Sequence, residues 1–335
     1  MLEKPDLSDA LLIAALRDEF ALNVTRLTFL PIGADRNTFV YRVDALDTAY
    51  FVKLRAEDFQ PVSVELPRLL YDQGVTQVIA PLHTRAGQLW SHVERFTLVV
   101  YPFVEGQDGF TVNLSDQHWI EFGRALRGLH SATLPADLLS RIPRETYPDM
   151  WRNQVREYQQ RATSETFADP AAAGLAALLR QRDDQINRLV QQAERLGEIL
   201  RSRADVFVVC HADIHAGNLL IDSAGGLHMV DWDTLILAPR ERDLMFVGGG
   251  LGGDGHTPDE ETALFYQGYG QTEADSLALA YYRCERIVQD IAAYCLEILD
   301  MTVGAEDRAR GLHQLSAQFE PGNVVELAFR SIQHS

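Results

Sequence analysis

The segment His211-Ala-Asp-Ile-His-Ala-Gly-Asn218 decides the fold class of this chain, together with Asp231-Trp-Asp233 downstream. An apolar, strand-like run at 206–209 precedes the segment. Two further apolar runs lie between the motifs, and Asp222-Ser-Ala-Gly-Gly226 joins them with a hairpin signature. The pattern is therefore a strand, a polar loop with Asp and Asn five residues apart, a hairpin, and a second acidic motif.

This order of elements is the one that protein kinases use for phosphoryl transfer. In that arrangement the loop Asp receives the proton of the acceptor hydroxyl, and the Asn and the later Asp bind Mg²⁺, which prefers carboxylate and amide oxygens. We therefore predict Asp213 as the catalytic base and Asn218 and Asp231 as magnesium ligands. The fold class that follows is α+β, a two-lobed protein-kinase-like fold with a small β-rich N-lobe and a large, mostly helical C-lobe.

Neighbouring polar residues are interpreted more simply. Asp222 belongs to the hairpin turn, and His211 is expected to brace the loop rather than to titrate in catalysis. Two roles fit Asp233 equally well, a second metal contact and a helix cap.

Lysine is rare in this chain, because 28 of its 30 basic residues are arginine and only Lys4 and Lys53 are lysine. Lys53 lies in the apolar run Tyr50-Phe-Val-Lys-Leu54, where a long cation is costly without a partner. This run is the third expected strand, from which kinases present the lysine that binds the α- and β-phosphates of ATP. A lysine that reaches solvent from a strand edge is the alternative. The carboxylate partner is expected on the next helix, with Glu65 the best placed and Glu57 an alternative.

Two further segments are predicted to contact the nucleotide. The segment Gly33-Ala-Asp-Arg-Asn-Thr-Phe39 occupies the phosphate-covering position, although an ordinary hairpin turn has the same composition. In Tyr101-Pro-Phe103, the backbone groups of alternate residues are expected to bond the adenine edge, so the middle residue needs no N–H. A proline that ends a strand explains this motif equally well. No Gly-Lys dipeptide occurs, which excludes a Walker P-loop.

The local pattern divides the chain at a hinge near residues 101–106. We expect a nucleotide-binding lobe over 1–103 and a catalytic and substrate-binding lobe over 104–335. The first lobe is expected to hold one helix at 62–71 and strands at 24–30, 38–43, 50–54, 77–80 and 96–103. In the second lobe, helices are expected after Ser115 and at 149–161, 171–201, 241–247, 259–268, 273–299 and 305–317.

The overall composition excludes some partners. The formal charge of −18 argues against nucleic-acid binding and is compatible with a cationic small molecule. Three isolated cysteines, no signal-like N-terminus and no apolar run of about 18 residues predict a cytoplasmic protein without membrane contact. The oligomeric state is left open.

With His215 added, the motif pair resembles the aminoglycoside phosphotransferase family, and further motifs resemble its spectinomycin phosphotransferase branch. These motifs are Gly33-Ala-Asp, Phe51-Val-Lys-Leu, Tyr101-Pro-Phe, Cys210-His-Ala-Asp-Ile-His-Ala-Gly-Asn, Ala238-Pro-Arg-Glu-Arg-Asp-Leu-Met-Phe and Asn323-Val-Val-Glu. The resemblance implies transfer of the ATP γ-phosphate to an aminocyclitol hydroxyl. It implies that Asp213 is the base, that Asn218 and Asp231 hold Mg²⁺, and that Lys53 contacts the nucleotide.

The acceptor is expected to be small. Only about ten residues separate Asp231 from the helix expected near Glu241, so the long activation segment that orders a peptide in protein kinases is missing. Carboxylates in 241–301 are candidates to meet substrate ammonium groups, and solvated helix faces explain most of them. The run 248–253 is either a mobile loop at the substrate cleft or a plain connector. Three functions are weighed: an antibiotic kinase for spectinomycin, a metabolic kinase for another small alcohol, and a pseudokinase.

Overall fold

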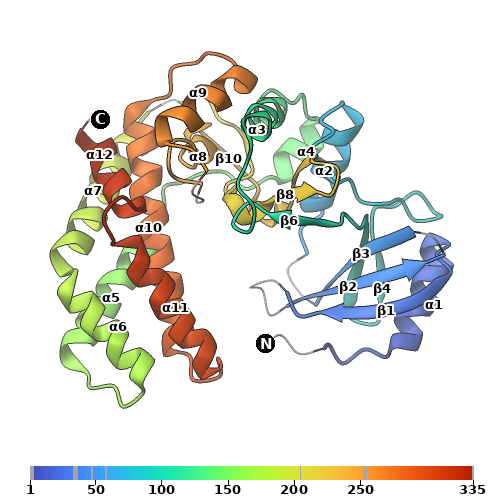
Figure 1. The fold of residues 1–335 in the computed structure, drawn as a ribbon, viewed down its shortest axis with the longest axis horizontal. Helices are drawn as coiled ribbons and strands as arrows, with labels where there is room; N and C mark the ends of the chain where they lie inside the picture. The colour runs from blue at the N-terminus through green and yellow to red at the C-terminus, as the bar shows by residue number, and fades with distance from the viewer. Residues whose placement is uncertain are drawn as a thin grey trace.

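The computed structural model describes residues 4–32, 37–46, 48–56, 59–203, 205–251 and 255–333, and they form two lobes (Figure 1). A five-stranded antiparallel sheet of order β1-β2-β3-β5-β4 forms the N-lobe. Its strands are β1 Val24–Leu30, β2 Thr38–Ala45, β3 Thr48–Arg55, β4 Ser91–Val93 and β5 Phe96–Pro102. The helices of the C-lobe lie on the other side of the molecule, which confirms the predicted fold class.

The central strand β3 explains the placement of Lys53. Successive side chains of a strand point to opposite faces, and Val52 and Leu54 are fully buried in the core beneath the sheet. Lys53 and Arg55 therefore point to the opposite face. In register, Lys53 lies between Val40 of β2 and Val99 of β5.

Helix α1 (Asp9–Phe20), which the sequence pattern did not predict, packs against the N-lobe sheet through Leu12, Leu16 and Phe20. Ser8 caps it by accepting a hydrogen bond from the Leu11 N–H. The strand predicted at 77–80 is wrong, because this segment makes only a single bridge, between Val78 and Met229.

Helix α2 (Val62–Asp72) belongs by its packing to the C-lobe. Its buried residues Val62, Leu66 and Leu70 lie in one hydrophobic cluster with C-lobe residues such as Trp119 and Phe122, separate from the cluster under the N-lobe sheet. Figure 1 shows α2 beside α4 and apart from β1–β3. The position of α2 decides where Glu65 points.

The C-lobe contains a helical body and several short strands. The strands lie around residues 211–218, which we call the catalytic segment. The strands form two small sheets, β10-β7 and β6-β8-β9, with β6 Gly106–Asp108, β7 Val208–Cys210, β8 Leu219–Asp222, β9 Leu227–Met229 and β10 Ile236–Ala238. The helices are α3 Asp116–His130, α4 Ala136–Arg141, α5 Met150–Ser164, α6 Pro170–Gln181, α7 Asp183–Arg201, α8 Glu241–Leu244, α9 Pro258–Tyr269, α10 Ser276–Leu299, α11 Ala305–Gln318 and α12 Val324–Gln333. Of these, α4 and α12 were not predicted. The single helix predicted over 171–201 is interrupted at Arg182, which ends α6 and precedes α7.

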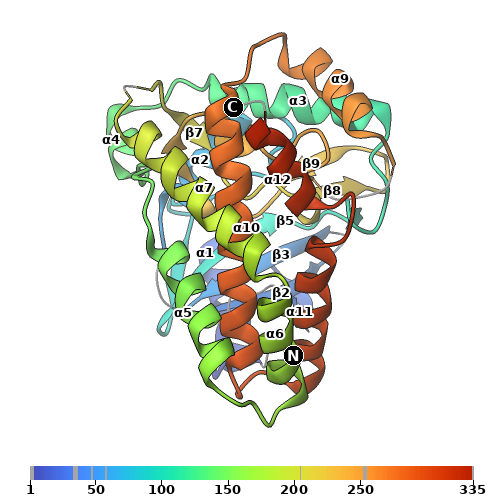
Figure 2. The same cartoon turned by 90° about the vertical axis from the view of Figure 1, so that its left-hand side faces the viewer.

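Helix α10 runs through the centre of the helical body, with α5, α6, α7, α11 and α12 around it (Figure 2). Buried residues recur along its length, from Ala278 to Ile298, as expected of a helix covered on several sides. Residues on α10 can therefore be held rigidly beside the catalytic segment. In the part of the chain that is described, no helix is long and apolar enough to cross a membrane.

Candidate active site

The catalytic segment forms a tight loop between β7 and β8 in which side chains satisfy the backbone. The Asn218 side-chain amide donates to the Asp213 carbonyl oxygen at 2.7 Å, and the His215 ring nitrogen Nδ1 accepts from the Gly217 N–H at 3.0 Å. A Cβ atom on Gly217 would lie 2.9 Å from the rings of His215 and Phe110, so a larger residue there would require these rings to shift. The loop geometry thus fixes Asp213 and Asn218 relative to each other.

Two residues of the site have left-handed backbone conformations that are unusual outside glycine. They are Ala212, with φ 69°, directly before Asp213, and Asp231, with φ 65°. Such conformations cost about 1–3 kcal/mol each and persist where surrounding contacts enforce them. They mark both acidic motifs as strained, which is typical of functional sites.

Asp243 on α8 makes the contacts that hold Ala212 in its left-handed conformation. Its two carboxylate oxygens accept the backbone N–H groups of Ala212 at 2.7 Å and His211 at 2.9 Å, and the His130 ring nitrogen Nε2 lies 3.0 Å away. Burial raises the pKa of Asp243, but the hydrogen bond from His130, the nearby imidazoles and the Ala212 N–H outweigh burial and hold it below its ordinary value. Asp243 is therefore a buried, ionised anchor of the catalytic loop.

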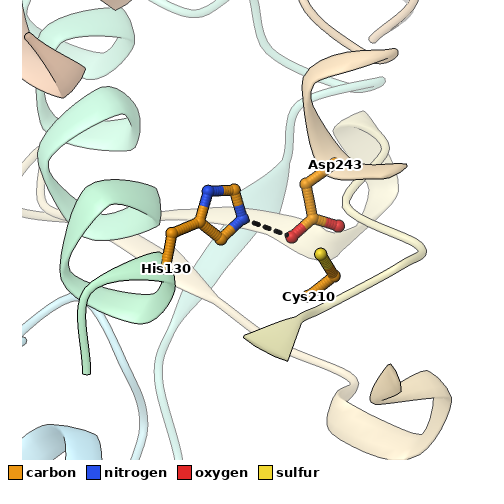
Figure 3. Close-up of side chains that lie close together, drawn as sticks. All are labelled: His130, Cys210 and Asp243. Carbon is orange, nitrogen blue, oxygen red and sulfur yellow. Dashed lines mark hydrogen bonds and ion pairs between the residues drawn. The ribbon is translucent and has the colours of Figure 1, made fainter. Parts of the chain in front are cut away.

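Cys210 lies beside this anchor, and Figure 3 shows it with His130 and Asp243. Three ligand types so close together resemble part of a metal site. The chemistry argues otherwise, because both Asp243 oxygens already accept hydrogen bonds and burial raises the pKa of the Cys210 thiol well above its usual value. A protonated thiol is a poor metal ligand. The group braces the loop.

His211 joins the two acidic motifs. It is fully buried, its ring nitrogen Nε2 lies 2.9 Å from the Val230 carbonyl oxygen, and its own carbonyl accepts from the Thr234 hydroxyl. Its ring packs on that of Trp232 with centroids 4.9 Å apart. These contacts agree with the structural role expected for His211.

Two clusters of charged residues lie around the catalytic loop. The first connects the two lobes and consists of Lys53, Arg55, Asp231 and Asp233; we call it the inter-lobe cluster. Lys53 forms an ion pair with Asp233 and lies 3.6 Å from Asp231, and Arg55 lies 2.6 Å from Asp233. Burial raises the pKa of Asp233, but the charges of Lys53 and Arg55 outweigh burial and lower it overall. For Asp231, burial and the charge of Asp233 raise the pKa. Asp233 therefore holds the cations, and the half-exposed Asp231 is less tightly engaged.

The second group lies within the C-lobe, and we call Asp213, Arg286 and Asp290 the C-lobe cluster. The Arg286 guanidinium on α10 forms an ion pair with the Asp213 carboxylate and lies 3.0 Å from Asp290. His215 Nε2 is 3.7 Å from the second Asp213 oxygen. Burial raises the pKa of Asp213, but the charges of Arg286 and His215 outweigh burial and hold this pKa below its ordinary value. The carboxylate is therefore ionised at neutral pH.

The structure brings together four of the eight predicted site residues in two pairs. Lys53 meets Asp231, and Asn218 meets Asp213. Asp233 caps no helix among the described residues, and its carboxylate forms an ion pair with Lys53; a metal contact of Asp233 stays a prediction.

Glu65 does not pair with Lys53, and this prediction is corrected. Its carboxylate lies 2.5 Å from Arg141 on α4. The reason is the packing of α2, whose apolar face is buried against the C-lobe and carries Glu65 away from the N-lobe sheet. The alternative partner, Glu57, lies outside the described residues.

The structure gives a different result for each of the nucleotide contacts predicted in the first lobe. Gly33 lies outside the described residues, as do residues 252–254 of the glycine-rich run. The Phe103 N–H donates to the Ala49 carbonyl oxygen at 3.1 Å, so the sheet uses the amide that was predicted to face adenine. The Tyr101 ring lies beside Phe51 at the end of β5, where burial and the charges of Asp233 and Asp231 raise its pKa.

Sequence reasoning gave no role at the catalytic loop to Asp243, Arg55 or Arg286, although it counted Asp243 among the acidic residues that could meet substrate and Arg286 among their local partners. Asp243 stands in a polar motif that looked like a helix start, and Arg55 was two residues from Lys53 on the same face of β3. No local pattern distinguishes Arg286 from the other arginines, because only the packing of α10 brings it to Asp213.

Comparison with known proteins gives consistent results. A sequence model of the phosphotransferase enzyme family (APH) matches residues 28–285. The structure of spectinomycin phosphotransferase, APH(9)-Ia, in complex with ADP and spectinomycin is similar with a TM-score of 0.91 and 34% sequence identity, over 98% of this chain and 100% of that one. The AMP-bound complex of the same enzyme gives 0.86 and 33% over 96% and 98%.

Protein StrN of Streptomyces griseus is 28% identical over 224 residues, which cover 65% of this chain and 67% of StrN. The family match spans well over half of the chain and includes both acidic motifs. The chain therefore belongs to the phosphotransferase enzyme family, as its resemblance to aminoglycoside phosphotransferases predicted, and is an ATP-dependent phosphotransferase that acts on an alcohol group.

Proposed function

We propose that this enzyme is a magnesium-dependent aminocyclitol kinase whose acceptor is spectinomycin. The observation that carries the proposal is the extent of the similarity to spectinomycin phosphotransferase, which covers 98% of this chain. The family match ends at residue 285, whereas this similarity continues into the rest of α10 and into α11 and α12. Those elements include Arg286, which pairs with the proposed base Asp213, and Asp290 and Gln318, which hold Arg286 from behind through a chain of contacts.

In the proposed reaction, the acceptor hydroxyl oxygen attacks the γ-phosphorus of ATP. The O–P bond forms as the bond between the γ-phosphorus and the β,γ-bridging oxygen breaks, and ADP leaves with that electron pair. The hydroxyl proton passes to the Asp213 carboxylate, which its lowered pKa keeps ionised at neutral pH. Asn218 holds the backbone of Asp213 and so keeps the base in place.

The donor set of the loop fits a hard cation. The Asn218 side-chain nitrogen is used by the Asp213 carbonyl, which leaves the amide oxygen as the group for Mg²⁺, and Asp231 offers a half-exposed carboxylate. Bound there, Mg²⁺ would neutralise charge on the transferring phosphate. Lys53, 3.6 Å from Asp231, is placed to bind the α- and β-phosphates. Because ATP is the donor, we expect the reaction in the cytoplasm.

The test is a substrate panel with the purified full chain, ATP and MgCl₂. Spectinomycin, streptomycin, ethanolamine, 1-amino-2-propanol and choline are offered separately, and products are identified by mass spectrometry. We expect one added phosphate on spectinomycin, with kcat/KM far above that of the simple amino alcohols. Efficient turnover of an amino alcohol with none of spectinomycin would overturn the proposed substrate and identify a metabolic kinase. Expression in a spectinomycin-sensitive host gives an independent readout, a raised inhibitory concentration.

A further inference from the structure

The connection between β6 and α3 carries an exposed aromatic ring beside the catalytic segment. Of the phenylalanine, tyrosine and tryptophan side chains in the described part of the chain, only Phe110 and Tyr71 are exposed, at 62% and 45%. Tyr71 lies on α2 under the guanidinium of Arg68. Phe110 stacks on the ring of His215, with centroids 5.5 Å and planes 21° apart. A single exposed apolar side chain is ordinary on a protein surface, so it is the position of Phe110 that distinguishes it.

The backbone around Phe110 is fixed against the catalytic segment. The Asp108 carboxylate accepts the Phe110 N–H at 3.1 Å, and the Gly109 N–H donates to the carbonyl oxygens of Ala216 and Leu219, both at 3.0 Å. A Cβ atom on Gly109 would lie only 3.0 Å from the Ala216 oxygen, so the two segments approach as closely as glycine allows. The Phe110 ring is therefore presented from a firmly held turn.

The open side of this ring belongs to the acceptor side of the loop. His215 covers one face of Phe110, and the opposite face accounts for the exposure of the ring. The same His215 ring has its Nε2 3.7 Å from an oxygen of Asp213. Figure 1 shows the connection from β6 to α3 on the side of the small sheet that faces α10. A molecule whose hydroxyl lies at Asp213 and that extends past His215 therefore meets Phe110.

We propose that Phe110 is a specificity-determining residue whose open face binds a C–H face of the acceptor ring. This inference rests on the proposed function, since it concerns the acceptor of the same site. An aminocyclitol ring has C–H bonds on its two faces and its hydroxyl and ammonium groups at the rim. It can therefore bury one face on a phenyl ring while a rim hydroxyl reaches Asp213. An acyclic amino alcohol has no such face and gains nothing from Phe110.

The experiment compares wild type with Phe110→Ala and Phe110→Trp, and with Tyr71→Ala as the control that removes the other exposed aromatic ring. The constants kcat and KM for spectinomycin are measured at saturating ATP. In Phe110→Ala we expect this KM to rise about tenfold and kcat to change less than about twofold, because the lost contact is made equally before and during phosphoryl transfer. Phe110→Trp keeps an aromatic face and should stay within about threefold of the wild-type KM. The control should match wild type.

A loss of kcat in Phe110→Ala with an unchanged KM would overturn the inference and make Phe110 a residue that only supports His215. If Phe110→Ala does not fold, Phe110→Leu replaces it, because leucine keeps an apolar side chain over His215 but has no flat face. We expect Phe110→Leu to raise KM for spectinomycin about threefold. A KM for Phe110→Leu equal to that of wild type contradicts the inference.

The failure of the proposed function is separable from this result. If wild type phosphorylates spectinomycin and Phe110→Ala keeps its KM, the proposed function stands and the role of Phe110 is wrong. If wild type phosphorylates no aminocyclitol, the proposed substrate is wrong, and the added fluorescence of Phe110→Trp over wild type decides the role of Phe110. A change in that emission on titration with spectinomycin or streptomycin supports the ring-binding face, and no change with either compound overturns it.

Discussion

The inter-lobe cluster and the C-lobe cluster each contain two carboxylates, but their cations come from different places. Asp231 and Asp233 receive Lys53 and Arg55, both from β3 of the other lobe. Asp213 and Asp290 share the single guanidinium of Arg286, which comes from α10 of the same lobe. One cluster has as many cations as carboxylates, and the other has an excess of negative charge.

The difference suits a loop that serves ATP and the cationic acceptor that we propose. ATP is a polyanion, so the cations of Lys53 and Arg55 suit the side of the loop proposed to bind the nucleotide. The Asp213 side keeps its geometry within one lobe and has an excess of negative charge, which suits the proposed acceptor.

Removing the proposed base, Asp213, from the C-lobe cluster should have the largest effect. For Asp213→Asn we expect kcat to fall by about 10²–10⁴, because proton acceptance is lost, while KM for ATP changes little. Steady-state phosphorylation of the acceptor measures both constants. Asp72→Asn, an exposed residue of α2, is the matched control and should retain wild-type kcat. A kcat for Asp213→Asn close to wild type would remove Asp213 from catalysis.

Breaking the inter-lobe cluster should act on the nucleotide instead. In Lys53→Met the charge-assisted contacts with phosphate, about 1.5–3 kcal/mol, are lost, and kcat/KM for ATP should fall roughly 10- to 150-fold. Lys53→Arg keeps the charge in a longer, planar group and should recover only part of the loss. Full activity of Lys53→Arg would mean that the cluster requires charge alone. Titration with ADP, followed by fluorescence, separates nucleotide binding from the chemical step.

The contrast also explains what the sequence could and could not predict. The placement of Asp213, Asn218 and Lys53 could be predicted because it is local: a loop of a few residues fixes the first two, and strand alternation fixes the third. The same local patterns were sufficient for the fold class, which the structure confirms. Arg286 and Asp243 were not identified, because packing of distant helices brings them to the loop from 73 and 31 residues away.

Helical periodicity likewise left two details undetermined. The break between α6 and α7 falls at Arg182, without Gly or Pro to signal it. Glu65 has the right position in the chain for a partner of Lys53, but an apolar stripe on α2 does not say which lobe will cover it. Only the packing against Trp119 and Phe122 decides this.

The anchor beneath both clusters should influence stability more than chemistry. Asp243→Asn removes the charge that holds the His211 and Ala212 N–H groups, and we expect the free energy of unfolding to fall by about 3 kcal/mol. A loss of about tenfold in kcat should accompany it, since Ala212 is then free to leave its strained conformation. Chemical denaturation at pH 7 measures the first effect.

The pH dependence checks that the Asp243 charge is responsible. Because its pKa is lowered in the folded protein, its stabilisation is fully present above the ordinary carboxyl pKa of about 3.9 and is lost as the pH falls through the folded value. The difference between wild type and Asp243→Asn should therefore be constant from about pH 5 to 8 and shrink below about pH 4. A difference that stays constant at acid pH would assign the effect to packing.

The smallest effect is expected at Glu65, which tests whether the inter-lobe cluster has a further member. Glu65 pairs with Arg141 at the partly exposed surface between α2 and α4, and such pairs contribute about 0–1 kcal/mol. Glu65→Gln should therefore change kcat/KM for ATP by less than about fivefold, as should the matched variant Arg141→Gln. To reach Lys53, α2 would have to withdraw Leu66 and Leu70 from the C-lobe core, at about 1.5–3 kcal/mol for each side chain. A loss in Glu65→Gln as large as that of Lys53→Met, with Arg141→Gln unaffected, would show that nucleotide binding makes α2 pay this cost, and that the inter-lobe cluster gains a third carboxylate during turnover.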